Sequence, residues 1–255
     1  MLFKGIINLK KYLLALIVIF PVFTYASDTP TEKTKWQKLL GQWSIVNSQA
    51  VENRAWAAPW EYYELLKYNT IITYKAPSDF NNITVKASTF DRFKTPSEFM
   101  ISFAITSERA SWFYHMYAFK ITGGFWGMDK VTFIKSDRLD KSKPFNAKNN
   151  SFVKEIASAD CSVKYDKTHE YSIKFEGHDA VLYINGKKIL SVRFPEKSHK
   201  GRIAISSKNV KVSVDSVEVK KNKKTVFEDD FNEDSIYMRR VKARISGANN
   251  DKKPE

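Results

Sequence analysis

The sequence predicts an all-β protein, an antiparallel sandwich of two sheets with little helix. Apolar and polar residues alternate with a period of two through most of the chain after Trp43, as in residues 99–105. Asn185-Gly186 separates two such runs, and Asn-Gly is typical of a two-residue hairpin because both residues tolerate a positive φ. Ten or more short strands with turns between them favour an antiparallel arrangement over βαβ units.

The last strong strand contains a change of parity. Its valines occupy one parity up to Val214 and the other from Val217, so we expect a β-bulge near Asp215-Ser216. The segment 225–231 (TVFEDDF) follows it, either as a closing edge strand, which we favour, or as the stub of a second domain. In chain order, the expected strands are 41–47, 69–75, 83–90, 99–105, 112–122, 130–136, 171–175, 180–184, 187–194, 202–208 and 210–219.

The first 26 residues have the pattern of a secretory signal peptide. Three lysines precede the apolar run 12–23, and Ala26 provides a small residue at the expected cleavage site. The alternative is an anchor that stays in the membrane, but a run of about 12 residues is shorter than the roughly 20 that span a bilayer. We therefore expect a periplasmic or secreted protein with no stable membrane anchor after cleavage.

The remaining chain divides into three parts. Residues 27–40 are expected to form a linker or short helix, 41–231 the sandwich, and 232–255 a basic, partly disordered tail. Cys161 is the only cysteine, which excludes an intramolecular disulfide and a cysteine zinc cluster. It lies in a strand-like segment, where we expect a small buried hydrophobic side chain.

The formal net charge of +14 suits an acidic polysaccharide, an anionic lipid surface or a nucleic acid. The lysines are spread along the chain and cluster only near 220–224 and 239–244, so a solubilising surface is the simplest interpretation. Because no helix-turn-helix, zinc-finger or RNA-binding aromatic motif is present, we expect no nucleic-acid partner.

The segment 169–192 (HEYSIKFEGHDAVLYINGKKILSV), followed by RIAISS at 202–207 and VKVSVDSVEV at 210–219, carries a family resemblance. It resembles the C-terminal half of laminin-G-like and concanavalin A-like domains, and segments 40–46, 79–85 and 117–133 are similar to earlier strands of these domains. The resemblance implies a concanavalin A-like jelly roll, nearest to the 3-keto-disaccharide hydrolase domain family. That family's N-S-G strand motif is absent, and so is the E-x-D-x-x-E run of laminarinase-type glucanases.

Aromatic residues suggest a sugar-binding groove on the concave sheet. Trp112, Tyr114 and Trp126 are candidates to stack on sugar rings, and Arg92 is a candidate ligand for an acidic sugar. Trp112 and Tyr114 would share one strand face. Alternatively, the two rings cap the edge of the sheet, and the glycine-rich loop that carries Trp126 is a plain hairpin.

The candidate catalytic residues are Glu98, Asp129 and His115, because glycoside hydrolysis needs a general acid and a general base. Glu98 lies on the small or polar face of its strand, and Asp129 follows the glycine-rich loop. His115 has the apolar parity, which is more typical of a core histidine. We expect no metal and no cofactor. The fold sometimes holds a structural calcium, but Asp215 alone does not make a six-oxygen site.

We therefore expect an exported glycan-active protein that hydrolyses or cleaves a modified di- or oligosaccharide in this groove. The alternative is a non-catalytic carbohydrate-binding protein or a structural envelope sandwich. In the first two cases the partner is a carbohydrate, with an acidic polysaccharide favoured by the charge.

Overall fold

The computed structural model describes residues 34–52, 68–77, 79–90, 96–107, 114–136, 153–194, 200–231 and 236–237. All of them belong to one compact unit, Pro30–Arg239. No helix long and apolar enough to cross a membrane occurs among the described residues. The described strands are β1 (Trp36–Leu40), β2 (Trp43–Val46), β3 (Gln49–Glu52), β4 (Asn69–Thr73), β5 (Asn82–Phe90), β6 (Ser97–Ser107), β7 (Tyr114–Gly123), β8 (Met128–Ser136), β9 (Val153–Val163), β10 (Thr168–Glu176), β11 (Asp179–Ile184), β12 (Lys187–Arg193), β13 (Arg202–Lys208), β14 (Lys211–Lys221), β15 (Lys224–Asp229) and β16 (Ile236–Tyr237).

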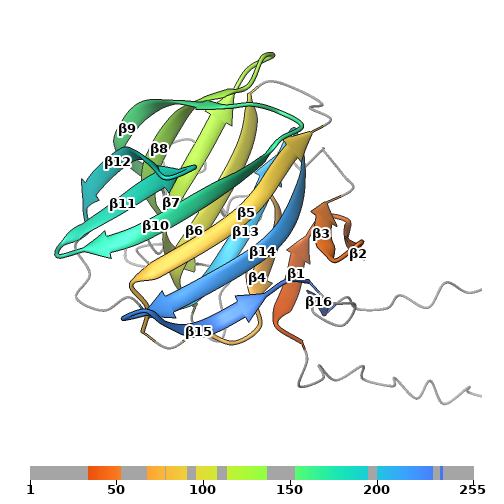
Figure 1. Cartoon of the computed structure of the whole chain (residues 1–255), viewed down its shortest axis with the longest axis horizontal. Coiled ribbons are helices and arrows are strands. Elements are labelled where there is room, and N and C mark those ends of the chain that lie inside the picture. The colour runs from red at the N-terminus through yellow and green to blue at the C-terminus, as the bar shows by residue number, and fades with distance from the viewer. Residues whose placement is uncertain are drawn as a thin grey trace, which may run out of the picture. The chain divides into compact units, whose positions relative to one another are not determined.

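The strands form two sheets that pack face to face (Figure 1). Sheet A has the order β16-β1-β4-β13-β6-β7-β8-β9, and sheet B has the order β12-β11-β10-β5-β14-β3-β2, with β15 also paired to β14. Every pairing between described strands is antiparallel except that of β1 with β16. The predicted antiparallel jelly-roll sandwich is confirmed.

The core lies between the sheets, with Phe103 of β6 at the centre of an aromatic cluster. Its ring centre lies 6.2 Å from that of Phe119 on the same sheet and 5.3 Å from that of Phe175 on sheet B. Phe103 has no exposed surface, and neither do Phe99 and Ile101 on the same strand. The alternation predicted for residues 99–103 therefore places these three side chains in the core, as expected.

Three local predictions are confirmed. Asn185 and Gly186 have φ values of 50° and 77°, as a type I′ hairpin turn requires, and they join β11 to β12. The register of β14 against β5 shifts between Val214 and Ser216, which is the expected bulge. Strand β15 pairs with β14, so the 225–231 segment closes the sheet edge.

The N-terminal part of the sandwich differs from the prediction. Residues 36–40, which we expected in a linker or short helix, form β1 between β4 and β16. Trp36 drives this pairing because its fully buried indole stacks on Phe231, and its Nε1 donates a hydrogen bond to Asp229 at 2.8 Å. Residues 236–237 of the expected tail also pair with β1. Residues 1–33 and 238–255 lie outside the described part of the chain.

Strand β6 departs from simple alternation at Ala104. Ala104 has a φ of 52°, and the register against β7 shifts between Phe103 and Thr106. Ala104 consequently faces the core between the sheets, whereas Ile105, which we expected there, packs with Met100 and Met116 on the opposite face of sheet A. A bulge inverts the parity of every residue that follows it, so sequence alternation alone misplaces Ile105.

Candidate functional site

Glu98 lies on the outward face of sheet A and is closed off from solvent. It is only 8 % exposed, accepts a 2.5 Å hydrogen bond from the Tyr68 hydroxyl, and pairs with Lys208 Nζ at 3.6 Å. The neighbouring outward residues Met100 and Ser102 have no exposed surface. Around Glu98 this face is therefore buried, and the open groove that we expected there is not formed by the described residues.

His115 lies far from Glu98 along sheet A. Its ring makes an edge-to-face contact with Tyr117 at 5.4 Å, which agrees with the apolar parity assigned from the sequence. Glu98 is paired with Thr122 of β7, seven residues along that strand from His115. At about 3.3 Å per residue the two side chains are separated by about 23 Å along the strand, too far to act on one bond.

Asp129 is exposed at the start of β8, two strands from Glu98 in sheet A. Burial raises the pKa of the Cys161 thiol on β9 to about 11, and the negative charges of Asp129 and Asp160 add to this effect. Asp129 therefore lies close to Cys161. Glu98 and His115 are therefore not brought together, and Asp129 lies two strands from Glu98, beside Cys161. Cys161 is half-buried rather than fully buried, and its raised pKa disfavours the reactive thiolate.

Two predicted sugar-binding residues, Arg92 and Trp112, lie outside the described residues. Tyr114 is the first residue of β7, and its side chain also lies outside the described part. The stacking role of Trp112 and Tyr114 accordingly stays a prediction.

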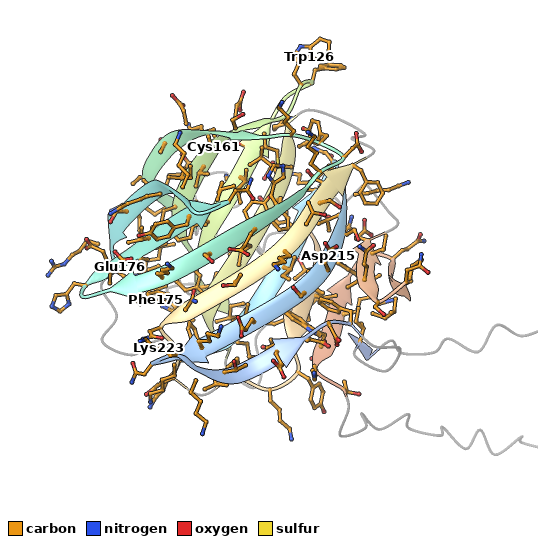
Figure 2. The ribbon with its side chains drawn as sticks, in the orientation of Figure 1. Trp126, Cys161, Phe175, Glu176, Asp215 and Lys223 are labelled. Atoms are coloured by element: carbon orange, nitrogen blue, oxygen red, sulfur yellow. The ribbon has the colours of Figure 1, made fainter. Side chains whose placement is uncertain are left out.

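Trp126 is placed at the tip of an aromatic finger, residues 123–127, which links β7 to β8. The Trp126 side chain is 94 % exposed and Phe125 is 65 % exposed. Figure 2 shows Trp126 projecting from one end of the sandwich. Two adjacent aromatic rings in solvent are unusual on a folded surface and mark a candidate contact site.

The finger is braced at its base. The Gly124 amide donates to the Gly127 carbonyl at 3.1 Å, and the Tyr165 hydroxyl donates to the Gly124 carbonyl at 2.8 Å. Gly127 packs tightly against β9, where an added Cβ would meet the Val163 carbonyl oxygen at 2.7 Å. These contacts hold the two rings away from the sheet at low conformational cost.

An end pocket of about 610 Å³ opens beside the same end of β9. Asn185 fixes one wall, because its side chain hydrogen-bonds the His169 ring at 2.8 Å and accepts from the Glu170 amide at 2.9 Å. Sequence reasoning used Asn185 as a turn signal only. The lining residues are Asp160, Cys161, Ser162, Ile184, Asn185, Lys187, Lys188 and Ile189.

The described residues offer no metal site. No group of three or more His, Cys, Asp or Glu side chains lies close enough among them to hold an ion. Both carboxylate oxygens of Asp215 already accept hydrogen bonds, from Gln49 at 2.8 Å and from Thr168 at 3.3 Å. This donor set does not fit a calcium ion, which takes six to eight oxygen ligands.

Comparison with known proteins assigns no family to this chain. No family model matches the chain, so the 3-keto-disaccharide hydrolase family stays a prediction. No curated protein matches either.

Among solved structures, the chain is similar to the carbohydrate-binding module CBM66 from Bacillus subtilis, with 14 % identity over 71 % of this chain and 92 % of that one and a TM-score of 0.48. It is similar to the Bacillus licheniformis β-glucanase, with 10 % identity over 76 % of this chain and 95 % of that one and a TM-score of 0.47. A prokaryotic β-1,3-1,4-glucanase derived from a mouse hindgut metagenome has 10 % identity over 74 % of this chain and 94 % of that one, with a TM-score of 0.48.

Proposed function

We propose that this chain is an exported carbohydrate-binding β-sandwich that binds a glycan through the aromatic finger and the adjoining end pocket. The observation that carries the proposal is the exposure of Trp126, 94 %, on a finger whose base is braced by Tyr165 and Gly127. A solvent-facing indole on a braced loop presents a flat apolar surface to the C–H face of a sugar ring, and its burial on binding is favourable.

The end pocket supplies the polar groups that such a surface needs. Asp160 and Ser162 offer acceptors to sugar hydroxyls, and Lys187 and Lys188 offer donors. Met128, which follows the finger, pairs with Val163, which follows Ser162. The finger and the pocket wall therefore arise from adjacent strand ends, and one glycan chain could contact both.

Binding is favoured over hydrolysis by the placement of the acidic residues. Glu98 is engaged by Tyr68 and Lys208, and His115 is about 23 Å away along the sheet, by strand geometry.

Export is supported by the N-terminal sequence, in which three lysines, an apolar run and Ala26 form a signal-peptide pattern. Finding Ser27 at the N-terminus of protein from the native host would support export, and an intact Met1 in a membrane fraction would contradict it.

Hydrolysis is a second candidate, favoured by one pair of carboxylates. Asp129 and Asp160 are both close enough to Cys161 to raise its pKa, and both are exposed near the finger. Such a pair could serve as general acid and base. Loss of turnover in both Asp129→Asn and Asp160→Asn, with binding retained, would support catalysis. If the native protein and both variants show no turnover, only the binding proposal remains.

Trp126→Ala tests the binding proposal against a panel of neutral oligosaccharides. We expect affinity to fall by about ten- to a hundredfold, the effect of losing one aromatic contact. The melting temperature should stay the same because the ring supports no packing. Tyr74→Ala is the matched control, since Tyr74 is an exposed aromatic residue after β4 at the opposite end of sheet A. Equal affinities of the Trp126→Ala variant and the native protein would overturn the proposal.

A further inference from the structure

A second pocket lies at the end of the sandwich opposite the aromatic finger, on sheet B. Its volume is about 530 Å³. Figure 2 shows Phe175, Glu176 and Lys223 gathered at this end of the sandwich, away from Trp126 and Cys161. We call it the lysine pocket, and its lining residues are Asn81, Asn82, Lys174, Phe175, Glu176, Lys220, Asn222 and Lys223.

The strand register places two lysines on either side of one asparagine. Asn82 of β5 is paired with Lys174 of β10 on one side and with Lys220 of β14 on the other. Their neighbours Ile83, Ile173 and Val219 are buried in the core, so the two lysines and Asn82 face outward. Three adjacent strands, about 4.8 Å apart, thus carry a lysine, an asparagine and a lysine side by side, and the Lys174 amine lies over the Tyr183 ring, 4.7 Å from its centre.

One wall of the pocket is a fixed turn. Asn222 and Lys223 have φ values of 48° and 70° and form the tip of the β14–β15 hairpin. The Asn222 amide donates to Asn81 Oδ1, and Asn81 Nδ2 donates to Asn222 Oδ1, both at 3.1 Å. Asn81 also donates its backbone amide to the Lys220 carbonyl at 2.8 Å. These bonds tie the turn to the start of β5 and hold Lys223 at the pocket rim.

The carboxylates near the pocket are already engaged. Glu176 accepts from the Tyr183 hydroxyl at 2.9 Å, and Glu218 pairs with Lys220 at 2.7 Å. The Lys220 hydrogen bond is the main cause that lowers the pKa of Glu218. The Asp79 carboxylate forms ion pairs with the Lys200 amine at 3.7 Å and with the Lys221 amine at 3.5 Å. Lysines outnumber carboxylates at this end, which favours an anionic ligand.

The pocket also lacks one hydrogen-bond donor. Asn82 Oδ1 is buried, and no group of the protein donates a hydrogen bond to it. A buried acceptor without a donor is costly, and a ligand hydroxyl could satisfy it.

From these contacts we propose that the lysine pocket binds a carboxylated sugar unit. The carboxylate pairs with the Lys174 amine and shares the Lys220 amine with Glu218, and a sugar hydroxyl donates to Asn82 Oδ1. The inference rests on the proposed glycan binding for the polymer that carries this unit. The lysine pocket would give the glycan a second contact point, at the end of the sandwich opposite the finger.

The test uses the intact protein and digalacturonate, a probe short enough to occupy one site, in calorimetric titrations at low salt. Lys174→Gln with Lys220→Gln should weaken digalacturonate binding by about tenfold or more, the usual effect of losing hydrogen bonds to a charged group. The matched control is Lys130→Gln with Lys154→Gln, which removes the same charge from exposed positions in β8 and β9 of sheet A and should change affinity less than about threefold, as expected for screened charges. An equal loss in both double variants would overturn the site.

Asn82→Ala separates a sugar acid from a simple anion. Digalacturonate should bind this variant more weakly, whereas inorganic sulfate, which has no hydroxyl to donate, should bind it as it binds the native protein. Sulfate binding as tight as digalacturonate binding would overturn the proposal. Lys174→Gln with Lys220→Gln should leave the affinity for neutral oligosaccharides unchanged. Loss of neutral-glycan binding therefore reports on the finger, and loss of digalacturonate binding reports on the lysine pocket.

Discussion

On sheet A, the outward-facing side chains Met100, Ala118 and Ala204 have no exposed surface. They belong to a second hydrophobic cluster, on the opposite face of the sheet from the main core. On sheet B, the outward positions carry residues such as Thr84 and Lys174, which are half-buried or exposed. Both sheets alternate with a period of two, yet the outward face of sheet A is buried around Met100, Ala118 and Ala204, whereas Thr84 and Lys174 of sheet B are open to solvent.

The comparison teaches that small residues on a strand face have two meanings. Alanine and serine can line an open groove, or they can allow close packing against that face. Ser102 illustrates the second case, because its side chain is fully buried and its hydroxyl has no hydrogen-bond partner. Glu98 was assigned to a groove because it lies on the small or polar face of its strand, and the structure shows that this face is packed at Met100 and Ser102.

The largest expected effect tests whether the outward face of sheet A is a true core. Met100→Ala should lower the free energy of unfolding by about 2–5 kcal/mol, comparable with the about 3–5 kcal/mol expected for Phe103→Ala between the sheets. Both side chains are fully buried. Urea denaturation of the two variants measures the effect. A cost below about 1 kcal/mol for Met100→Ala alone would mean that this face is open in solution, since exposed sites usually cost less.

Glu98→Ala should have a smaller effect. It leaves the Tyr68 hydroxyl without its acceptor and Lys208 without its carboxylate, which should cost about 1–3 kcal/mol. Glu98→Gln is the control, because an amide oxygen can still accept from Tyr68. Unchanged stability in Glu98→Ala, together with lost turnover of any glycan, would return Glu98 to a catalytic role.

Much of the fold could be predicted from local signals. The Asn185-Gly186 turn, the bulge before Ser216 and the closing strand each follow from a few adjacent residues. Ile105 could not be placed, because the positive φ of Ala104 that inverts its parity has no signal in an alanine. Trp36 was missed as a strand residue because its partners, Asp229 and Phe231, lie almost two hundred residues away.

The sites were harder to predict than the fold. Trp126 was a candidate from the sequence because an aromatic residue in a glycine-rich loop is a local pattern, and its binding role stays a prediction. The lysine pocket depends on the order β10-β5-β14, which brings Lys174, Asn82 and Lys220 side by side from distant segments. Strand order in a sandwich is set by packing of the whole chain, and alternation within one strand carries no information about it.

The smallest expected effect concerns the open face of sheet B. Thr84→Val removes the hydroxyl that hydrogen-bonds Ser172 at 3.1 Å and keeps the branched shape that suits a strand. The free energy of unfolding should change by less than about 0.5 kcal/mol, because water can replace the lost partner at this half-buried position. Urea denaturation at several protein concentrations measures it. A concentration-dependent cost near that of Met100→Ala would show that sheet B is also covered in solution, by a second copy of the chain, and the contrast between the two faces would disappear.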